Sequence, residues 1–303
     1  MRRLHFALAL SLVFSVRCSS PSVQPPLQAL PILEEKGVPR VEARVHPEAP
    51  LPGSVFAFEM EVWPPASTAS VEFEGLRIPL WRVSESRFRG ILGVDFKEKE
   101  GGIPLQIFVE GKWMRQVEIL LSGREDVIQK LTLPSEKVDL GPKDLARVKK
   151  EQAELETLWN RGKADPLWEK AFRKPVGGEI GTPFGVRRFI NGEERNPHLG
   201  VDLKSSQGTP IRASNSGQIV WVADQFFGGN TVVIDHGAGL FTLYMHLSKV
   251  GVAVGEEVVR GEVIGFVGAT GRATGPHLHW GAHFYEYNVD PLSLLNIDRE
   301  DNP

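Results

Sequence analysis

Cysteine is almost absent from this chain of 303 residues, since Cys18 is the only one. A single cysteine excludes a disulfide framework and a zinc cluster built on thiolates, so a metal site would have to use histidine or carboxylate ligands. No apolar run reaches the ~18 residues that a transmembrane helix needs. The net charge is -3, with no block of five or six like charges, which argues against nucleic acid as a partner. The sequence also shows no fixed internal repeat, so neither a solenoid nor a propeller is expected.

The first 20 residues have the pattern of a signal peptide. Arg2 and Arg3 precede an apolar stretch over residues 6–16, which is too short to span a bilayer. We therefore expect an exported protein of the periplasm or cell envelope. Cys18 stands where a lipoprotein would carry its anchor, but Arg17 occupies a position where a small residue is usual. A lipid tether through Cys18, ordinary cleavage near Ser20 and an incidental cysteine all stay open.

The remaining chain predicts two domains, because about 100 to 200 residues are usual for one. Residues 21–40 are rich in Ser, Pro and Gln and are typical of a linker. Residues 41–140 predict an immunoglobulin-like β-sandwich, in which Phe56, Phe58, Met60 and Val62 form one apolar face at the period of a strand. Further strands are expected over residues 71–80, 88–96, 103–109 and 117–121. The fold class is therefore mostly β.

A connecting helix and a second domain are expected next. Apolar residues recur at helical spacing between Lys143 and Asn160, with Pro142 near the start and Gly162 beyond the end. We assign residues 141–174 to this connection. Residues 175–303 return to short, glycine-punctuated strands, such as 231–235 and 240–246, and predict a second β-domain.

Histidine is concentrated in this second domain, where six of the eight histidines lie between residues 198 and 283. His198 and Asp202 are four residues apart, and His277 and His279 are two apart. Residues at even separations on a strand point to the same face, so each pair would converge on one ion. Two histidines and one aspartate match the three protein ligands of a catalytic zinc. Two strand histidines facing a groove would explain an isolated H-x-H equally well.

Four stretches together have a more specific meaning: HLGVD at 198–202, GTPI at 208–211, TLYMHLS at 242–248 and GATGRATGPHLHW at 268–280. They resemble the lysostaphin/LytM-type zinc metallopeptidases, from about Gly181 to Leu295. The resemblance implies a glycine-rich antiparallel β-domain that binds Zn²⁺ and hydrolyses peptide bonds in bacterial peptidoglycan. It implies that the zinc ligands are His198, Asp202 and His279. It places the catalytic pair at His246 and His277.

The implied chemistry needs no covalent enzyme intermediate, because zinc supplies hydroxide from water near neutral pH. His277 would act as general acid and base, and His246 would stabilise the oxyanion or share the proton transfer. The order of these two roles stays open. The alternatives are a non-catalytic scaffold that recruits another cell-wall hydrolase, and a secreted protease for other peptides. All five site positions are occupied, which argues against the scaffold.

Other residues of the second domain receive plainer interpretations. His236 is expected to be structural, in a turn, whereas His283 would line a groove. Tyr244 would face either the core or the substrate. Residues 268–275 lack the Lys-Ser/Thr of a phosphate-binding loop, so they predict only a loop that leads to His277. The N-terminal domain would position the enzyme on the wall, cover the groove or bind a regulatory protein partner.

Overall fold

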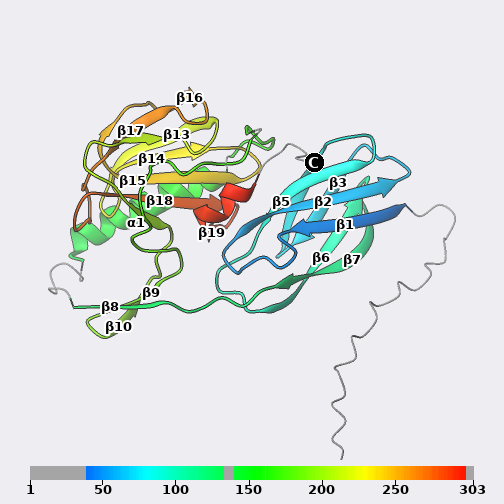
Figure 1. The fold of residues 1–303 in the computed structure, drawn as a ribbon, viewed down its shortest axis with the longest axis horizontal. Coiled ribbons are helices and arrows are strands. Elements are labelled where there is room, and N and C mark those ends of the chain that lie inside the picture. The colour runs from blue at the N-terminus through cyan, green and yellow to red at the C-terminus, as the bar shows by residue number, and fades with distance from the viewer. Residues whose placement is uncertain (1–38, 133–139, 161, 169, 298–303) are drawn as a thin grey trace, which may run out of the picture. The chain divides into compact units, whose positions relative to one another are not determined.

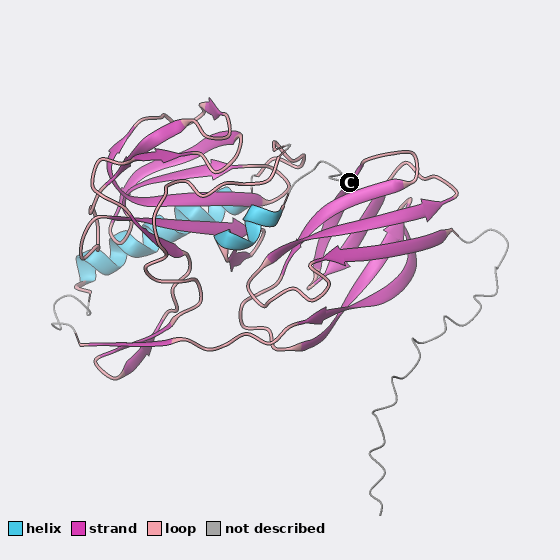
Figure 2. Cartoon of the chain, in the orientation of Figure 1, coloured by secondary structure: helices cyan, strands magenta, loops and turns pink. Residues whose placement is uncertain are grey.

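The computed structural model describes residues 39–132, 140–160, 162–168 and 170–297. Strands dominate these residues, with one long helix (Figure 2). The predicted signal peptide, Cys18 and nearly all of the predicted linker lie outside the described residues. None of the helices in the described part of the chain is both long and apolar enough to cross a membrane.

The N-terminal part is an antiparallel sheet whose order is β1-β2-β5-β4-β3-β6-β7. Its strands are β1 (Arg40–His46), β2 (Val55–Trp63), β3 (Ala69–Phe73), β4 (Leu76–Arg82), β5 (Arg87–Gly93), β6 (Gly101–Val109) and β7 (Lys112–Leu121). Phe56 in β2 contacts Phe73 in β3, with ring centroids 6.1 Å apart, so the two halves of the sheet pack against each other. The mostly β class is confirmed, while the immunoglobulin-like type stays a prediction.

The predicted apolar face of β2 is confirmed, because Phe56, Phe58, Met60 and Val62 are all buried. The single strand expected over residues 71–80 is wrong. Glu74 and Gly75 have φ angles of 49° and 79°, which turn the chain between β3 and β4 into a two-residue hairpin. Strand β1 was not predicted, and it begins at Arg40, inside the expected linker.

Helix α1 (Pro142–Trp159) fulfils the expectation of a connecting helix. Pro142 fits its first turn because proline has no N–H to leave unpaired there. The helix has no fully buried residue, and its apolar side chains Leu155 and Trp159 are partly buried against Val233, Phe241 and Leu243. The helix is therefore held by packing on one side only. The domain limits at residues 140, 174 and 303 stay predictions.

The C-terminal part contains the main antiparallel sheet, in the order β11-β18-β15-β14-β13-β16 (Figure 1). These strands are β11 (Val201–Lys204), β13 (Gly217–Gln225), β14 (Gly229–Asp235), β15 (Leu240–Val250), β16 (Glu257–Val258) and β18 (His277–Phe284). Strands β12 (Pro210–Arg212), β17 (Val263–Val267) and β19 (Tyr287–Val289) join its sides, and the 3-10 helix Pro291–Asn296 follows. Val232, Ile234, Tyr244 and Trp280 are fully buried in its core.

A small three-stranded sheet accompanies it, in the order β10-β9-β8. Its strands are β8 (Ile128–Leu131), β9 (Arg187–Ile190) and β10 (Glu193–Arg195). Strands β9 and β10 form a hairpin around Asn191 and Gly192, both at positive φ. Because β10 ends three residues before His198, this hairpin leads directly into the predicted site.

Candidate metal centre

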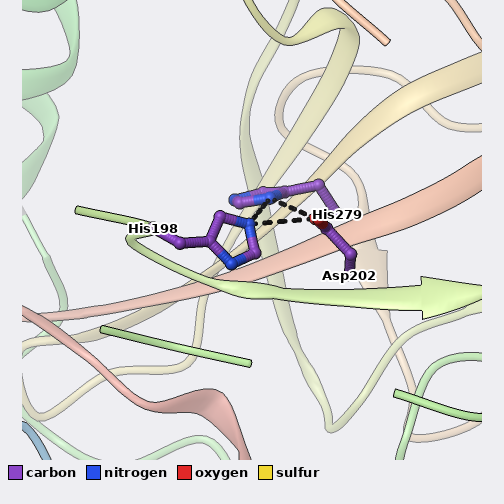
Figure 3. A group of neighbouring side chains, drawn as sticks. All are labelled: His198, Asp202 and His279. Carbon is purple, nitrogen blue, oxygen red and sulfur yellow. Dashed lines mark hydrogen bonds and ion pairs between the residues drawn. The ribbon is translucent and has the colours of Figure 1, made fainter. Parts of the chain in front are cut away.

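His198, Asp202 and His279 lie side by side in the structure (Figure 3). Asp202 is in β11 and His279 is in β18, and the two residues are direct cross-strand partners. His198 precedes β11, and its main chain bonds instead to Gly185 and Val186. The expected convergence of His198 with Asp202 is therefore found, although the regular strand begins only at Val201.

Three possible ligand atoms form a nearly equilateral triangle. His198 Nε2, Asp202 Oδ1 and His279 Nδ1 are each 3.0 Å from the other two. His198 is 3% exposed, and the other two side chains are 15–17% exposed. Tetrahedral zinc, with bonds of about 2.0–2.1 Å, separates its ligand atoms by roughly 3.3 Å. The triangle is close to that spacing, and its two imidazoles and one carboxylate are suitable zinc ligands.

A backbone carbonyl determines the tautomer of His198. Its Nδ1 lies 2.9 Å from the carbonyl oxygen of Pro183, and a carbonyl can only accept a hydrogen bond. Nδ1 must therefore carry the proton, and a neutral His198 turns the lone pair of Nε2 toward the oxygen of Asp202. Two lone pairs at 3.0 Å repel each other unless a cation or a proton lies between them. This arrangement favours a bound cation.

His246 and His277 lie beside the triangle, with ring centroids 4.7 Å apart. His277 Nε2 is 3.7 Å from Asp202 Oδ1, and the ring of His246 is 6.1 Å from that of His279. Each holds its Nδ1 at 2.9 Å from a carbonyl oxygen, that of Thr270 for His246 and that of Gly275 for His277. Both rings therefore keep Nε2 as the proton acceptor when they are neutral.

His246 has an unusual backbone conformation, with φ of 67° in the left-handed region. Its N–H donates to the carbonyl of Gly228 at 2.7 Å, and strand pairing changes register on either side of it. Such strain is concentrated at functional sites, where the surrounding structure enforces it. The sequence predicted a plain strand residue here.

Burial favours the neutral form of two imidazoles of this cluster, those of His246 and His279. Burial, reinforced by the nearby His279, lowers the pKa of His246 from 6.5 to about 4. Burial also lowers the pKa of His279. For Asp202, burial raises the pKa, but the adjacent imidazoles of His198 and His279 outweigh it and bring the pKa below its usual value. The result is an anionic Asp202 beside the neutral rings of His246 and His279, which is a protonation pattern that favours binding of a divalent metal.

A sequence profile described as "Peptidase family M23" matches residues 196–291, which contain all five of these residues. The crystal structure of a Pseudomonas aeruginosa protein assigned to peptidase M23 superimposes with a TM-score of 0.65. It is 30% identical, and the match covers 81% of this chain and 95% of that one.

The chain belongs to peptidase family M23.

Two curated relatives are also similar. The "DD-carboxypeptidase/endopeptidase Mpg" of Neisseria meningitidis is 46% identical over 115 residues, 38% of this chain and 26% of that protein. The "Peptidoglycan DD-endopeptidase ShyA" of Vibrio cholerae is 32% identical over 248 residues, 70% of this chain and 53% of that protein. This chain thus spans between about a quarter and a half of these relatives. The family resemblance drawn from the motifs is confirmed.

Three other predictions in the M23 region can be compared with the structure. His236 is fully buried and bonded to the Ser216 carbonyl and to Thr242, as a structural residue should be. Tyr244 is buried in the core, where it contacts Ser214 and Thr242. His283 does not line a groove, because it is buried and stacks on Trp159 of helix α1 at 4.2 Å.

Sequence reasoning missed Gly200, in the middle of the HLGVD motif. A Cβ at this position would lie 2.5 Å from His279 Nε2 and 2.7 Å from the carbonyl oxygen of Trp280. The absence of a side chain at Gly200 therefore leaves the space that the His279 ring occupies. The pattern of the sequence indicated only that Gly200 disfavours a helix, because the close approach comes from β18, about 80 residues away.

Proposed function

We propose that this protein is a zinc-dependent endopeptidase that hydrolyses peptide bonds in bacterial peptidoglycan. The observation that carries the proposal is the triangle of His198 Nε2, Asp202 Oδ1 and His279 Nδ1, flanked by the imidazole rings of two further histidines. Membership of peptidase family M23 supports peptide hydrolysis. The peptidoglycan substrate is supported by the relative whose name is a peptidoglycan DD-endopeptidase.

In this proposal, His198, Asp202 and His279 hold the zinc ion. Bound zinc would supply a Lewis acid that polarises the scissile carbonyl and lowers the pKa of water to about 7. The hydrogen bond from His198 Nδ1 to Pro183 fixes the orientation of one ligand ring, as partners beyond the first ligands commonly do.

His277 and His246 carry out the proton transfer in this proposal. His277 Nε2 is 3.7 Å from Asp202 Oδ1, so it can take a proton at the centre of the site and later return it to the leaving amine. The low pKa of His246, about 4, keeps its ring neutral at pH 7. A neutral His246 can accept a proton or orient water through Nε2, while its Nδ1 stays on the Thr270 carbonyl.

The proposed place of action is the cell envelope, which is where peptidoglycan is found. The signal peptide over residues 1–20 would deliver the chain there. The tether through Cys18 and a regulatory protein partner of the N-terminal domain stay predictions from the sequence. Each would be compatible with an endopeptidase.

The test is release of soluble peptides from purified peptidoglycan by the full chain, with and without a chelator and with zinc added back. We expect zinc-dependent release that is lost in His277→Ala and kept in His46→Ala, which changes an exposed histidine of β1. Absence of release by the zinc-loaded protein would contradict the proposed activity and favour the scaffold. Release that persists with chelator would contradict the role of the metal.

A further inference from the structure

The β9–β10 hairpin extends directly from the metal centre. Arg188 and Arg195 are direct cross-strand partners in it. The same register continues to Gly185 and His198, whose main chains are hydrogen-bonded at 2.7 Å. Three residues of strand cover roughly 10 Å, a distance that the long side chain of arginine can largely bridge. The two arginines therefore lie at the end of the hairpin that continues toward His198.

The two faces of this hairpin differ in charge. On one face, Arg187 is paired with carboxylates, at 2.8 Å from Glu194 and 3.4 Å from Asp126. On the other face, Arg188 meets Arg195, although like charges on directly opposed residues are unfavourable. Glu193 pairs with Arg195 at 2.8 Å on that second face. A strand pair that collects two guanidinium groups on one face is therefore suited to binding an anion.

A third arginine, Arg272 in the loop at 268–275, lies within electrostatic range of these two. Arg272 Cζ lies 4.9 Å from the ring centroid of Phe227, and the Arg272 N–H donates to the Phe227 carbonyl. Burial lowers the pKa of Arg272, and nearby Arg195 lowers it further. Burial likewise lowers the pKa of Arg188; Asp202 opposes that effect, and Arg272 adds to it. The three guanidinium groups are thus close enough to repel one another, and Arg188 is close enough to attract a metal ligand.

Arg188 is half-buried, and a hydrogen bond to the neighbouring strand orients its side chain. Its Nε donates to Gln129 Oε1 of β8 at 3.3 Å, and Gln129 is its register partner in the parallel β8–β9 pair. An arginine fixed at Nε offers its terminal nitrogens in a defined direction. A planar guanidinium binds a carboxylate through two parallel hydrogen bonds, which gives both affinity and orientation.

We propose that Arg188, Arg195 and Arg272 form a carboxylate-binding subsite, which holds a free carboxylate of the substrate peptide beside the scissile bond. This inference rests on the proposed endopeptidase function and specifies the substrate class further, as an anionic peptide. The carboxylate is either the terminal α-carboxylate of the peptide or the side-chain carboxylate of a cross-linking diamino acid. A neutral peptide of the same length would lack this anchor.

The experiment uses the zinc-loaded full chain and one soluble cross-linked peptide in three forms: the free acid, the form amidated at its terminus and the form amidated at its side-chain carboxylate. We expect kcat/KM for the free acid to exceed that for one of the amides by about tenfold or more, mainly through KM, since charge-assisted hydrogen bonds are stronger than neutral ones. The amide that loses this advantage identifies which carboxylate is bound.

Arg188→Gln should remove the preference by slowing cleavage of the free acid and leaving the disfavoured amide nearly unchanged. Arg188→Lys should keep part of the preference, because the positive charge stays but the two parallel N–H donors of the guanidinium are lost. The matched control is Arg187→Gln. Arg187 is one residue away on the opposite face of the hairpin, where it pairs with Glu194, so this variant should keep the full preference. Zinc content and the circular dichroism spectrum of each variant show that the fold and metal centre are intact.

Equal cleavage of all three forms by the unaltered protein would overturn the subsite while leaving the endopeptidase in place. So would an Arg188→Gln variant that slows all three forms equally. If none of the forms is cleaved, the proposed function has failed, and calorimetric titration with the free-acid and amidated peptides then tests the subsite alone. Equal binding of acid and amides would overturn it, and tighter binding of the acid that depends on Arg188 would support it.

Discussion

Gly200→Ala tests whether the space around His279 controls metal binding. The added methyl would lie 2.5 Å from Nε2 and 2.7 Å from Cε1 of His279. Ordinary van der Waals contact begins at 3.4 Å, so the ring would have to retreat by about 0.9 Å. The other neighbour, the Trp280 carbonyl at 2.7 Å, belongs to the backbone of β18 and cannot rotate away.

A retreat of that size matters because ligand distances in metal sites are held within about 0.2 Å. His279 Nδ1, now 3.0 Å from both partner atoms, would leave the triangle. We expect the zinc affinity to fall about 100-fold, which corresponds to about 2.7 kcal/mol. The fold itself should lose about 1–3 kcal/mol of unfolding free energy through overpacking.

The assay is competition for zinc between the protein and a chromophoric chelator at pH 7. Urea unfolding in zinc-free buffer measures the effect on the fold separately. The control is Gly177→Ala, because a Cβ at Gly177 meets nothing within 4 Å and its φ is not positive. A zinc dissociation constant for Gly200→Ala within about threefold of the unaltered protein would refute the reasoning.

Three further predictions concern other parts of the site and its surroundings. Burial lowers the pKa of His283 from 6.5 to about 4, so its neutral ring stabilises the fold above pH 6.5, and this contribution is lost as the pH falls toward 4. When the pH is lowered from 7 to 5, the free energy of unfolding of His283→Phe in urea should therefore fall by about 2 kcal/mol less than that of the unaltered protein. An identical fall in both proteins would contradict this. His246→Asn, whose new residue tolerates a positive φ, should keep one zinc per chain but lose peptidase activity about 100-fold or more; retained activity would remove His246 from the mechanism. Glu151→Gln should raise KM severalfold, because both Glu151 oxygens accept the Phe226 N–H of the loop that contacts His246. The control Glu154→Gln, on the exposed face of the helix, should leave KM unchanged. Equal KM values in both variants would exclude a role of Glu151 in bracing this loop.

Several elements were predictable because their signals are local. The alternation of apolar residues in β2 reflects burial of one face, and the proline before Lys143 marks the start of helix α1. The turn at Glu74 and Gly75 was not predicted, because Glu-Gly lacks the Asn or Asp that usually favours positive φ in a two-residue hairpin. Strand β1 was missed since its exposed face alternates charged residues with few large apolar ones.

The candidate site likewise combines features that short motifs predict with features that depend on residues distant in the sequence. The spacing of His198 with Asp202, and of His277 with His279, carries the chemistry in short motifs that can be found without a structure. The left-handed backbone at His246 and the space at Gly200 depend on neighbours distant in the sequence. The facing of Arg188 and Arg195 depends on the register of a hairpin that the sequence analysis treated only as a polar loop. Residue types are readable from spacing, whereas orientation comes from tertiary contacts.

The carbonyl groups of Pro183, Thr270 and Gly275 have a consequence for how this site can change during evolution. Every residue has a carbonyl whatever its side chain, so these three contacts survive any substitution that preserves the path of the main chain. The proton on each Nδ1 is thus assigned by the backbone, without a dedicated aspartate or glutamate that a single codon change could remove. Side chains around the site are then free to diverge and adopt new substrates, while the tautomer of the three imidazoles is inherited with the fold.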